Sequence, residues 1–317
     1  MTTLLVASTG GHLKQLHHLH KRLSDVRGPF RWATFDTPQS RSLLSGETVD
    51  FVPFVGGRDP INVMRNLASA RRAFRHRDID TVVSTGSAVA LPFMALARAR
   101  GVRCHYVESA ARSDGPSLTG RLVSRIPGVR LYAQYPDWAQ GRWKFGGSVF
   151  DAFERSAPSL DGPERLDKVV VALGTYEGYG FPLLIRCLLE ILPSETEVLW
   201  QTGDTDITDF DIQGHRAIPE MDLTQAMREA DVVVSHAGVG TALAALEVGQ
   251  CPLLVPRRVS RREHVDDHQT QIANELRNRG LAVSVEADSL SLNDLLAAAK
   301  SRVITLAQAP PFVTVST

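Results

Sequence analysis

Residues 232–247 read VVVSHAGVGTALAALE and decide the fold. The short apolar run at 232–235 is typical of a strand that is buried in a sheet. The small residues from His236 to Thr241 form a loop, and a helix is expected to reach Glu247. A strand, a glycine-containing loop and a helix in this order predict a βα unit of a parallel sheet.

The same cycle repeats along both halves of the chain. We expect residues 1–150 and 168–300 to form two Rossmann-like domains of an α/β protein, facing each other across a cleft. Residues 151–167 are rich in Pro, Ser, Gly and charge, which is typical of a linker, and 301–317 remain an unassigned tail. The apolar runs behind this division are 3–7, 30–34, 81–84, 103–107, 130–133, 168–173, 196–201, 230–235, 252–255 and 282–285.

Composition limits the classes of partner. The 317 residues carry 35 Lys plus Arg against 35 Asp plus Glu, so general electrostatics do not favour nucleic acid as a partner. The first residues lack a basic leader, and no window approaches the ~18 apolar residues of a spanning helix. We therefore expect a cytoplasmic protein with at most peripheral membrane contact.

The loop from His236 to Thr241 is suited to a diphosphate. Small residues such as Gly238 and Gly240 let a phosphate approach the backbone, and the amino terminus of the following helix stabilises negative charge without a metal. Gly174 and Thr175 follow the strand at 168–173 in the same way and are a second candidate, although an ordinary turn also explains them.

A second glycine loop follows the first strand of the chain, where Gly10, Gly11 and His12 precede a helix. Imidazole titrates near neutral pH, so His12 is a candidate for the general base that accepts a proton from a substrate hydroxyl. A helix cap or an anion ligand are the alternatives for the same side chain.

The segment 261–269, RREHVDDHQ, concentrates polar side chains after the strand at 252–255. His264 and His268 are four residues apart, which is a metal spacing on a helix. We favour hydrogen bonds to sugar hydroxyls instead, because Gln269 and the carboxylates suit them and the phosphate charge already has a helix terminus. The sequence therefore predicts no metal and no cofactor, a nucleotide-sugar being a substrate.

At these residues the chain resembles the MurG-related glycosyltransferases of the GT-B fold. It also resembles bacterial capsule and exopolysaccharide transferases and the two-subunit enzyme of the dolichol pathway, with the acceptor and donor components fused. The motifs that carry this resemblance are STGGHLKQL (8–16), RDPINVMRNL (58–67), STGSAVALP (84–92), VESAARSDGPSLTGRL (107–122), YAQYPDW (132–138), VALGTYEGYGFPLLI (171–185), ADVVVSHAGVGTALAALEVGQCPLLVPR (230–257) and EHVDDHQ (263–269).

The resemblance implies roles for particular residues. His236 to Thr241 would hold the donor diphosphate, and the polar segment would face the donor sugar. His12 and Glu108 are the catalytic candidates that it places on the acceptor side. The implied donor-binding residues are Gly174, Thr175, His236, Gly238, Val239, Gly240, Thr241, Glu247, His264, Asp267, His268 and Gln269; the acceptor-side residues are Gly10, Gly11, Thr85, Gly86, Ser87 and Arg112.

One position departs from the family pattern. Relatives often carry a ribose-binding Glu eight residues after the His of the glycine loop, where this chain has Ala244. Glu247 lies about one helical turn further on and is the candidate replacement.

These residues predict an inverting transfer of a sugar from a nucleotide diphosphate donor, with UDP expected, to a lipid-linked or polysaccharide acceptor in cell-surface glycan synthesis. Two alternatives stay open. A nucleotide-sugar 2-epimerase also has two Rossmann-like domains, and a noncatalytic anchor or enhancer of another transferase would carry similar motifs.

Two groups of arginines remain. The segment from Arg58 to Arg77 places Arg65, Arg71, Arg72, Arg75 and Arg77 among apolar side chains, which is typical of a basic helix at an anionic membrane surface, with a solvated helix as the alternative. That contact would hold the protein at the inner face of the cell membrane. Arg257, Arg258, Arg261 and Arg262 either recognise a carboxylated sugar or face water.

Overall fold

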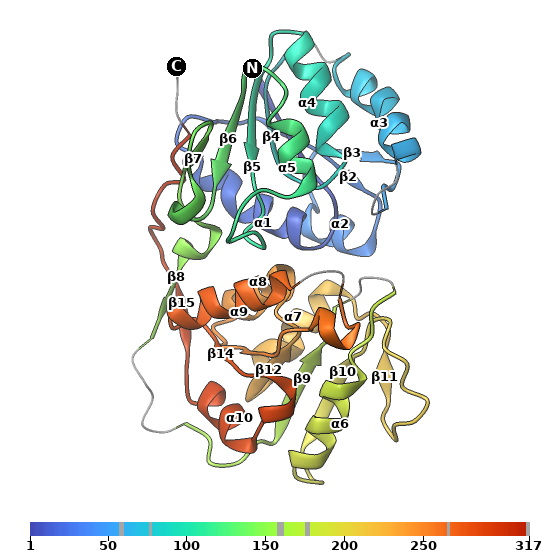
Figure 1. Cartoon of the computed structure of the whole chain (residues 1–317), viewed down its shortest axis with the longest axis vertical. Coiled ribbons are helices and arrows are strands. Elements are labelled where there is room, and N and C mark those ends of the chain that lie inside the picture. The colour runs from blue at the N-terminus through green and yellow to red at the C-terminus, as the bar shows by residue number, and fades with distance from the viewer. Residues whose placement is uncertain (57–59, 76–77, 157–161, 175–177, 265–266, 315–317) are drawn as a thin grey trace. The chain divides into compact units, whose positions relative to one another are not determined.

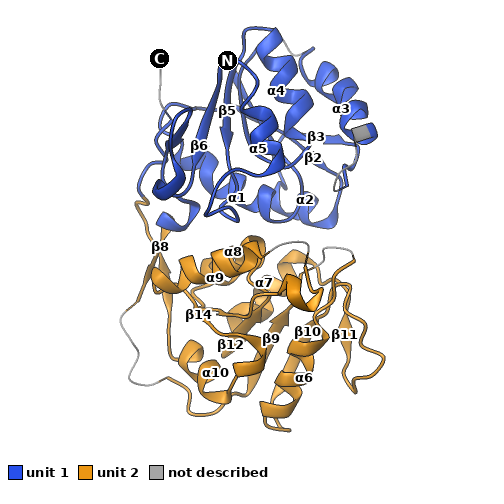
Figure 2. Ribbon diagram, in the orientation of Figure 1, with its two compact units in different colours: residues 1–151, 310–317 blue, residues 152–309 orange. Residues whose placement is uncertain are grey.

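The computed structural model describes residues 1–56, 60–75, 78–156, 162–174, 178–264 and 267–314. The chain divides into two compact units, one of residues 1–151 with 310–317 and one of residues 152–309 (Figure 2). The α/β class and the parallel sheets predicted from the sequence are confirmed.

Unit 1 contains a seven-stranded sheet in the order β3-β2-β1-β4-β5-β6-β7, with parallel pairing throughout (Figure 1). Its core joins the apolar side chains of these strands to those of the helices, with Phe93 and Met94 fully buried. The strands are β1 (Thr2–Ala7), β2 (Phe30–Phe35), β3 (Val49–Val52), β4 (Ile79–Gly86), β5 (Arg103–Val107), β6 (Val129–Ala133) and β7 (Trp143–Phe145); the helices are α1 (Gly11–Leu19), α2 (Pro38–Leu43), α3 (Pro60–Ala73), α4 (Ala90–Ala99) and α5 (Leu118–Val123), with short 3-10 turns η1 (His20–Arg22), η2 (Pro136–Trp138) and η3 (Val149–Ala152).

Unit 2 contains a six-stranded parallel sheet in the order β11-β10-β9-β12-β13-β14. Apolar side chains fill both of its faces, in clusters that include Val171 and Val234 on one side and Val170 and Val233 on the other. The strands are β9 (Lys168–Ala172), β10 (Glu197–Gln201), β11 (Gly214–His215), β12 (Val232–Ser235), β13 (Leu253–Leu254) and β14 (Val283–Ser284); the helices are α6 (Pro182–Ile191), α7 (Glu220–Glu229), α8 (Val239–Glu247), α9 (His268–Asn278) and α10 (Leu292–Ala299), with 3-10 turns η4 (Val259–Arg261) and η5 (Ala287–Ser289).

The two sheets share one topology. In each, the first strand of the unit's sheet pairs on one side with the second and on the other with the fourth, which is the Rossmann order. Ligands of such sheets bind beyond the carboxyl ends of the strands, where the strand order reverses. These positions are the ends of β1 and β4 in unit 1 and the ends of β9 and β12 in unit 2.

The ends of the predicted domains differ from the structure. Within the segment expected to be a linker, β8 (Phe153–Arg155) pairs antiparallel with β15 (Val303–Thr305) of the expected tail, and both belong to unit 2. The last residues return to unit 1, where the buried Phe312 packs on Tyr132 and occupies the space beside Gly146. The chain therefore passes between the units twice, after Asp151 and after Ala309.

Candidate functional site

The turn between β12 and α8 presents a helix amino terminus at the switch point of unit 2. Ala237 adopts a left-handed conformation with φ of 57°, and Gly238 is the N-cap of α8. The first N–H groups of a helix have no partner within the helix, and its dipole places positive charge there. Val239, Gly240 and Thr241 form the first turn, so the predicted diphosphate loop lies at a true helix terminus.

Two glycines from different loops pack against the imidazole of His236. A Cβ atom at Gly238 would lie 2.4 Å from His236 Nε2, and one at Gly174 would lie 2.6 Å from Cε1 of the same ring. Gly174 also has a φ of 76°, which L side chains rarely adopt. The backbones after β9 and β12 therefore meet around one ring, which leaves no room for a side chain at either glycine.

His236 is held in one tautomer. Its Nδ1 lies 3.2 Å from the carbonyl oxygen of Ala172, and because a carbonyl only accepts, Nδ1 carries the hydrogen. Burial, followed by the charge of Arg257, lowers the pKa of His236 to about 3. The neutral ring presents the Nε2 lone pair, so His236 supports the turn and supplies no positive charge to a phosphate.

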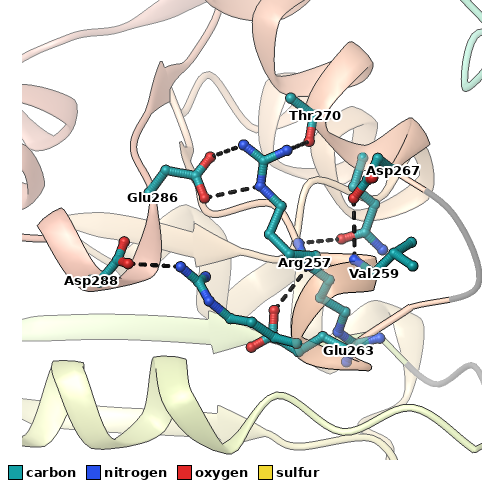
Figure 3. Close-up of polar contacts among 10 residues, drawn as sticks. Arg257, Val259, Glu263, Asp267, Thr270, Glu286 and Asp288 are labelled. Carbon is teal, nitrogen blue, oxygen red and sulfur yellow. Dashed lines mark hydrogen bonds and ion pairs between the residues drawn. The ribbon is translucent and has the colours of Figure 1, made fainter.

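The loop after β13 is held by three side-chain oxygens, which accept hydrogen bonds from its backbone N–H groups (Figure 3). Arg257 N–H donates to Gln269 Oε1 at 3.0 Å, and Arg258 N–H donates to Glu263 Oε2 at 2.9 Å. Val259 N–H donates to Asp267 Oδ1 at 3.1 Å. Two of the residues predicted to face the donor sugar thus also fix the backbone beside it.

Two arginines of the cluster at 257–262 form ion pairs with carboxylates of unit 2. Arg258 forms a two-pronged ion pair with Glu286, at 3.0 and 2.5 Å, and Arg261 pairs with Asp288 at 2.7 Å (Figure 3). The expectation that this cluster as a whole recognises a carboxylated sugar therefore requires a correction, because Arg258 and Arg261 already have carboxylate partners. Arg257 is buried and has none among the described residues.

Three rings gather near the start of α9. The rings of His264 and His268 are 4.7 Å apart edge to face, and that of Tyr179 lies 5.4 Å from His264. In the described ranges, which exclude 265–266, His, Cys, Asp and Glu side chains form no group of three suited to a metal ion. The absence of a metal stays a prediction.

In unit 1, the predicted acceptor-side loops meet at the ends of β1 and β4. His12 Nδ1 donates to the carbonyl of Thr85 at 2.7 Å, and Thr85 Oγ1 donates to the carbonyl of His12 at 2.8 Å. A Cβ atom at Gly86 would lie 3.1 Å from the His12 ring. Gly10 caps α1 with a φ of 80° and open space around it, and Ser87 leads into α4.

Glu108 is buried, with 1% of its surface exposed, and its carboxylate is hydrogen-bonded to the neighbouring loop. Its carboxylate accepts from Ser109 N–H, from Ser117 N–H and from Ser117 Oγ, at 3.0–3.1 Å. Burial raises its pKa, opposed by these hydrogen bonds and by the charge of Arg112. A Cβ atom at Gly120 would overlap Glu108 Oε2. Glu108 thus holds the start of α5.

The loop that carries Arg112 is fixed by buried amides. Gln15 Oε1 accepts from Ala110 N–H at 2.7 Å and from Gln134 Nε2 at 3.1 Å, while Trp138 Nε1 donates to the carbonyl of Arg112 at 3.0 Å. Sequence reasoning missed Gln15 and Gln134. Both lie within the matched motifs, but polarity alone gave no sign that they would be buried.

Residues 169–302 match the glycosyltransferase family 28 C-terminal domain. Over its length the chain is 27% identical to the UDP-N-acetylglucosamine–N-acetylmuramyl-(pentapeptide) pyrophosphoryl-undecaprenol N-acetylglucosamine transferase of Shewanella amazonensis, covering 93% of this chain and 86% of that protein. The corresponding enzyme of Shewanella baltica is also 27% identical, with 92% and 85% covered.

The chain is a MurG-related glycosyltransferase. Its fold is that of Acinetobacter baumannii MurG, with a TM-score of 0.56 at 20% identity over 94% of this chain and 89% of that one. The UDP-GlcNAc 2-epimerase of Methanocaldococcus jannaschii has a TM-score of 0.58 at 12% identity, covering 99% and 96%. The fold alone therefore does not separate transferase from epimerase.

Other predicted residues of this MurG-related transferase lie apart from the glycine turn or beyond the described ranges. Thr175 lies outside the described residues. Ala244 is buried among apolar side chains on α8, and Glu247 ends that helix about 12 Å along the axis from Val239. Its contact with a nucleotide stays a prediction. Two residues that the sequence did not single out individually as site residues contact predicted ones or their neighbours: Arg257 donates to the carbonyl of Leu173, beside Gly174, and the ring of Tyr179 lies against His264.

Proposed function

We propose that the protein is an inverting transferase that moves a sugar from a UDP-sugar to a lipid-linked acceptor. The observation that carries this proposal is the glycine-lined amino terminus of α8 within the family 28 match. The names of the relatives from Shewanella support the choice of substrates, because they specify UDP-N-acetylglucosamine and an undecaprenol-linked acceptor.

The donor diphosphate is assigned to the first turn of α8. Backbone N–H groups from Gly238 to Thr241 and the helix dipole stabilise the charge that develops as the sugar–phosphate bond breaks. The transfer uses neither a metal nor a cofactor in this proposal, since the helix terminus supplies the electrostatic stabilisation. Glu247 remains the candidate for the ribose.

The donor sugar is assigned to the start of α9. Gln269 uses its Oε1 to accept from Arg257 N–H, which orients the side-chain amide so that its NH2 group is the donor left for a ligand. The half-buried His264 and His268 adjoin it with Tyr179. This set offers hydrogen bonds to sugar hydroxyls and an aromatic surface.

His12 is assigned as the general base. Its Nδ1–H donates to Thr85, so in the neutral ring the Nε2 lone pair takes the proton of the acceptor hydroxyl. The acceptor oxygen then bonds to the anomeric carbon while the electron pair of the old bond leaves with the diphosphate, inverting the centre. Glu108 is the weaker candidate, since its carboxylate holds α5.

Helix α3 is assigned to the membrane surface. Ile61 and Met64 are 67% and 66% exposed, whereas Phe74 is buried in the core. Arg65, Arg71, Arg72 and Arg75 lie on the exposed surface of the helix and adjoining turn. Arg58 and Arg77, the ends of the predicted segment, lie outside the described residues. Among the described residues, no helix has both the length and the apolar character needed to cross a membrane.

A direct test combines binding and turnover. Thermal shift against UDP, GDP and dTDP identifies the base, because a ligand that binds the folded state raises the melting temperature. UDP release from UDP-N-acetylglucosamine in the presence of a polyprenyl-diphosphate-linked glycan then reports transfer. Stabilisation by no nucleotide diphosphate would end the proposal, and stabilisation without transfer to any lipid-linked acceptor would favour a noncatalytic partner.

The second candidate is a nucleotide-sugar 2-epimerase, because the UDP-GlcNAc 2-epimerase of Methanocaldococcus jannaschii has a similar structure. Incubation with UDP-N-acetylglucosamine alone separates the two. An epimerised donor formed without acceptor selects the epimerase, whereas an unchanged donor that is consumed only when acceptor is added selects the transferase.

A further inference from the structure

Arg257 is a buried cation that has no counter-ion among the described residues. Only 1% of its surface is exposed, Nη2 donates to the carbonyl of Leu173 at 2.8 Å, and the guanidinium carbon lies 5.7 Å from the ring centre of Phe181. Its Nε is buried and has no hydrogen-bond partner, and no carboxylate in the described part of the chain forms an ion pair with it. Arginine in this position is unusual because buried charges are normally paired.

The charge persists at neutral pH. Burial lowers the pKa of Arg257 to about 10, while the field of Glu263 opposes that shift. Glu263 does not form an ion pair with it; its Oε2 instead accepts from the backbone N–H of Arg258. Taking a cation out of water without a partner is costly in free energy. The folded protein therefore holds an uncompensated positive charge at this place, and a nearby bound anion would offset part of that cost.

Arg257 is connected through its neighbours to the turn that we assign to the diphosphate, and its charge acts on His236 in that turn. It binds the carbonyl of Leu173, and the next residue, Gly174, packs on the ring of His236, which also contacts Gly238 at the N-cap of α8. The strands that precede these segments, β9, β12 and β13, are neighbours in the sheet. The buried charge and the helix terminus therefore belong to one structural unit.

We propose that Arg257 is a positioning residue whose buried charge favours the donor diphosphate at the amino terminus of α8 without touching it. This inference rests on the proposed function. A sugar carboxylate is the weaker alternative, because a guanidinium that is 1% exposed offers no accessible edge for a two-pronged pair. His236 is neutral, whereas Arg257, whose charge acts on that ring, carries a formal positive charge.

The experiment measures binding of UDP, UMP and uridine by calorimetry to the full-length wild type, Arg257→Gln and Arg257→Lys. We expect Arg257→Gln to weaken UDP binding about tenfold, which is about 1.4 kcal/mol, and to leave uridine binding unchanged. Arg261→Gln is the matched control, since it removes an arginine of the same loop that already pairs with Asp288. It should bind UDP as the wild type does.

The lysine variant separates charge from packing. A buried ammonium titrates more readily than a guanidinium, so UDP affinity of Arg257→Lys should approach that of the wild type at pH 6.5 and fall towards that of Arg257→Gln by pH 8.5. The wild type should not follow this trend. If Arg257→Gln does not fold, the pH dependence of UDP binding to Arg257→Lys tests the proposal by itself.

Other outcomes overturn the inference. Equal loss of UDP and uridine binding would indicate a structural role, and unchanged UDP binding in Arg257→Gln would remove the role altogether. A loss confined to a UDP-hexuronate would assign Arg257 to a sugar carboxylate. Failure of the wild type to bind any nucleotide diphosphate would reject the proposed function itself, and this inference with it.

Discussion

The carbonyl oxygen of Thr85 accepts a hydrogen bond from Nδ1 of His12 at 2.7 Å, and this contact fixes the tautomer of the imidazole. A base held in this way needs no rearrangement before it accepts a proton at Nε2. We predict that His12→Ala lowers kcat by roughly 10²- to 10⁴-fold, the usual contribution of a general base, while the donor Kd stays within about twofold. Steady-state kinetics with calorimetry of UDP binding measure both.

A second variant tests the tautomer argument itself. His12→Asn retains an N–H that can donate to the carbonyl of Thr85 but has no basic nitrogen, so its kcat should fall as far as that of His12→Ala. His215→Ala, which removes an exposed imidazole on β11, should have wild-type kinetics. Full turnover in His12→Asn would remove proton acceptance from the role of His12.

The contact of Gly174 with His236 gives the second prediction. A methyl group at Gly174 would lie 2.6 Å from the ring in a backbone conformation with φ of 76°. We expect Gly174→Ala to displace the ring and the turn that precedes α8, weakening UDP binding by at least tenfold. Thermal shift by UDP and direct calorimetry provide the measurement.

Gly46→Ala is the matched control. Gly46 has a φ of 84°, similar to that of Gly174, but a Cβ atom there would meet no other atom within 4 Å. Both variants should therefore lose about 1–2 kcal/mol of stability from the left-handed conformation, and only Gly174→Ala should also lose UDP binding. Similar UDP affinity in the two variants would contradict the packing argument.

The parts of the site that follow from the sequence are those that constrain the backbone locally. The glycine turns before α1 and α8 were predictable, because a strand, small residues and a helix in succession leave few alternatives. The short strands β3 and β11 were not, since two to four residues carry little periodicity and become strands through pairing with β2 and β10.

The contacts between side chains that are distant in the sequence could not be predicted from the sequence either. Asp267 and Gln269 read as ligands of a sugar, yet their oxygens accept backbone N–H groups 8 and 12 residues away. Arg258 reads as a free cation, but Glu286 lies beside it because β14 neighbours β13. A polar residue in a motif therefore indicates importance more reliably than it indicates which partner the side chain meets.

The third prediction concerns acid stability of unit 1. His105 is 1% exposed, stacks on Tyr132 and hydrogen-bonds to its hydroxyl at 3.1 Å. Burial lowers its pKa from 6.5 to about 4. The unfolded chain therefore binds the proton first as pH falls, so the stability that depends on neutral His105 is present above pH 6.5 and is lost as pH drops towards 4.

Between pH 7 and pH 5 this loss amounts to about 2 kcal/mol of unfolding free energy. His105→Phe keeps an aromatic ring against Tyr132 but does not titrate, so we expect it to be less stable at pH 7 and to lose about 2 kcal/mol less between the two pH values. Urea unfolding followed by fluorescence compares the two proteins. Parallel pH profiles would show that His105 does not cause the acid sensitivity.

The exposed side of α3 gives the fourth prediction. Arg71 and Arg72 of α3 and Arg75 of the adjoining turn are exposed, with Ile61 and Met64 nearer the amino terminus of the helix. Each arginine near an anionic surface contributes about 1 kcal/mol to binding, so replacing the three by Ser should weaken association with phosphatidylserine vesicles by roughly a hundredfold. Flotation with phosphatidylserine-containing and neutral vesicles, at two salt concentrations, measures the effect.

The apolar and basic contributions can be separated. Replacing Ile61 and Met64 by Ser should reduce binding to both kinds of vesicle, whereas loss of the arginines should matter only on the anionic ones and should vanish in high salt. A control that replaces exposed Arg186, Arg228 and Arg277 of unit 2 removes the same charge from other helices. If that control loses vesicle binding to the same extent, net charge explains the attraction, and α3 has no special part in it.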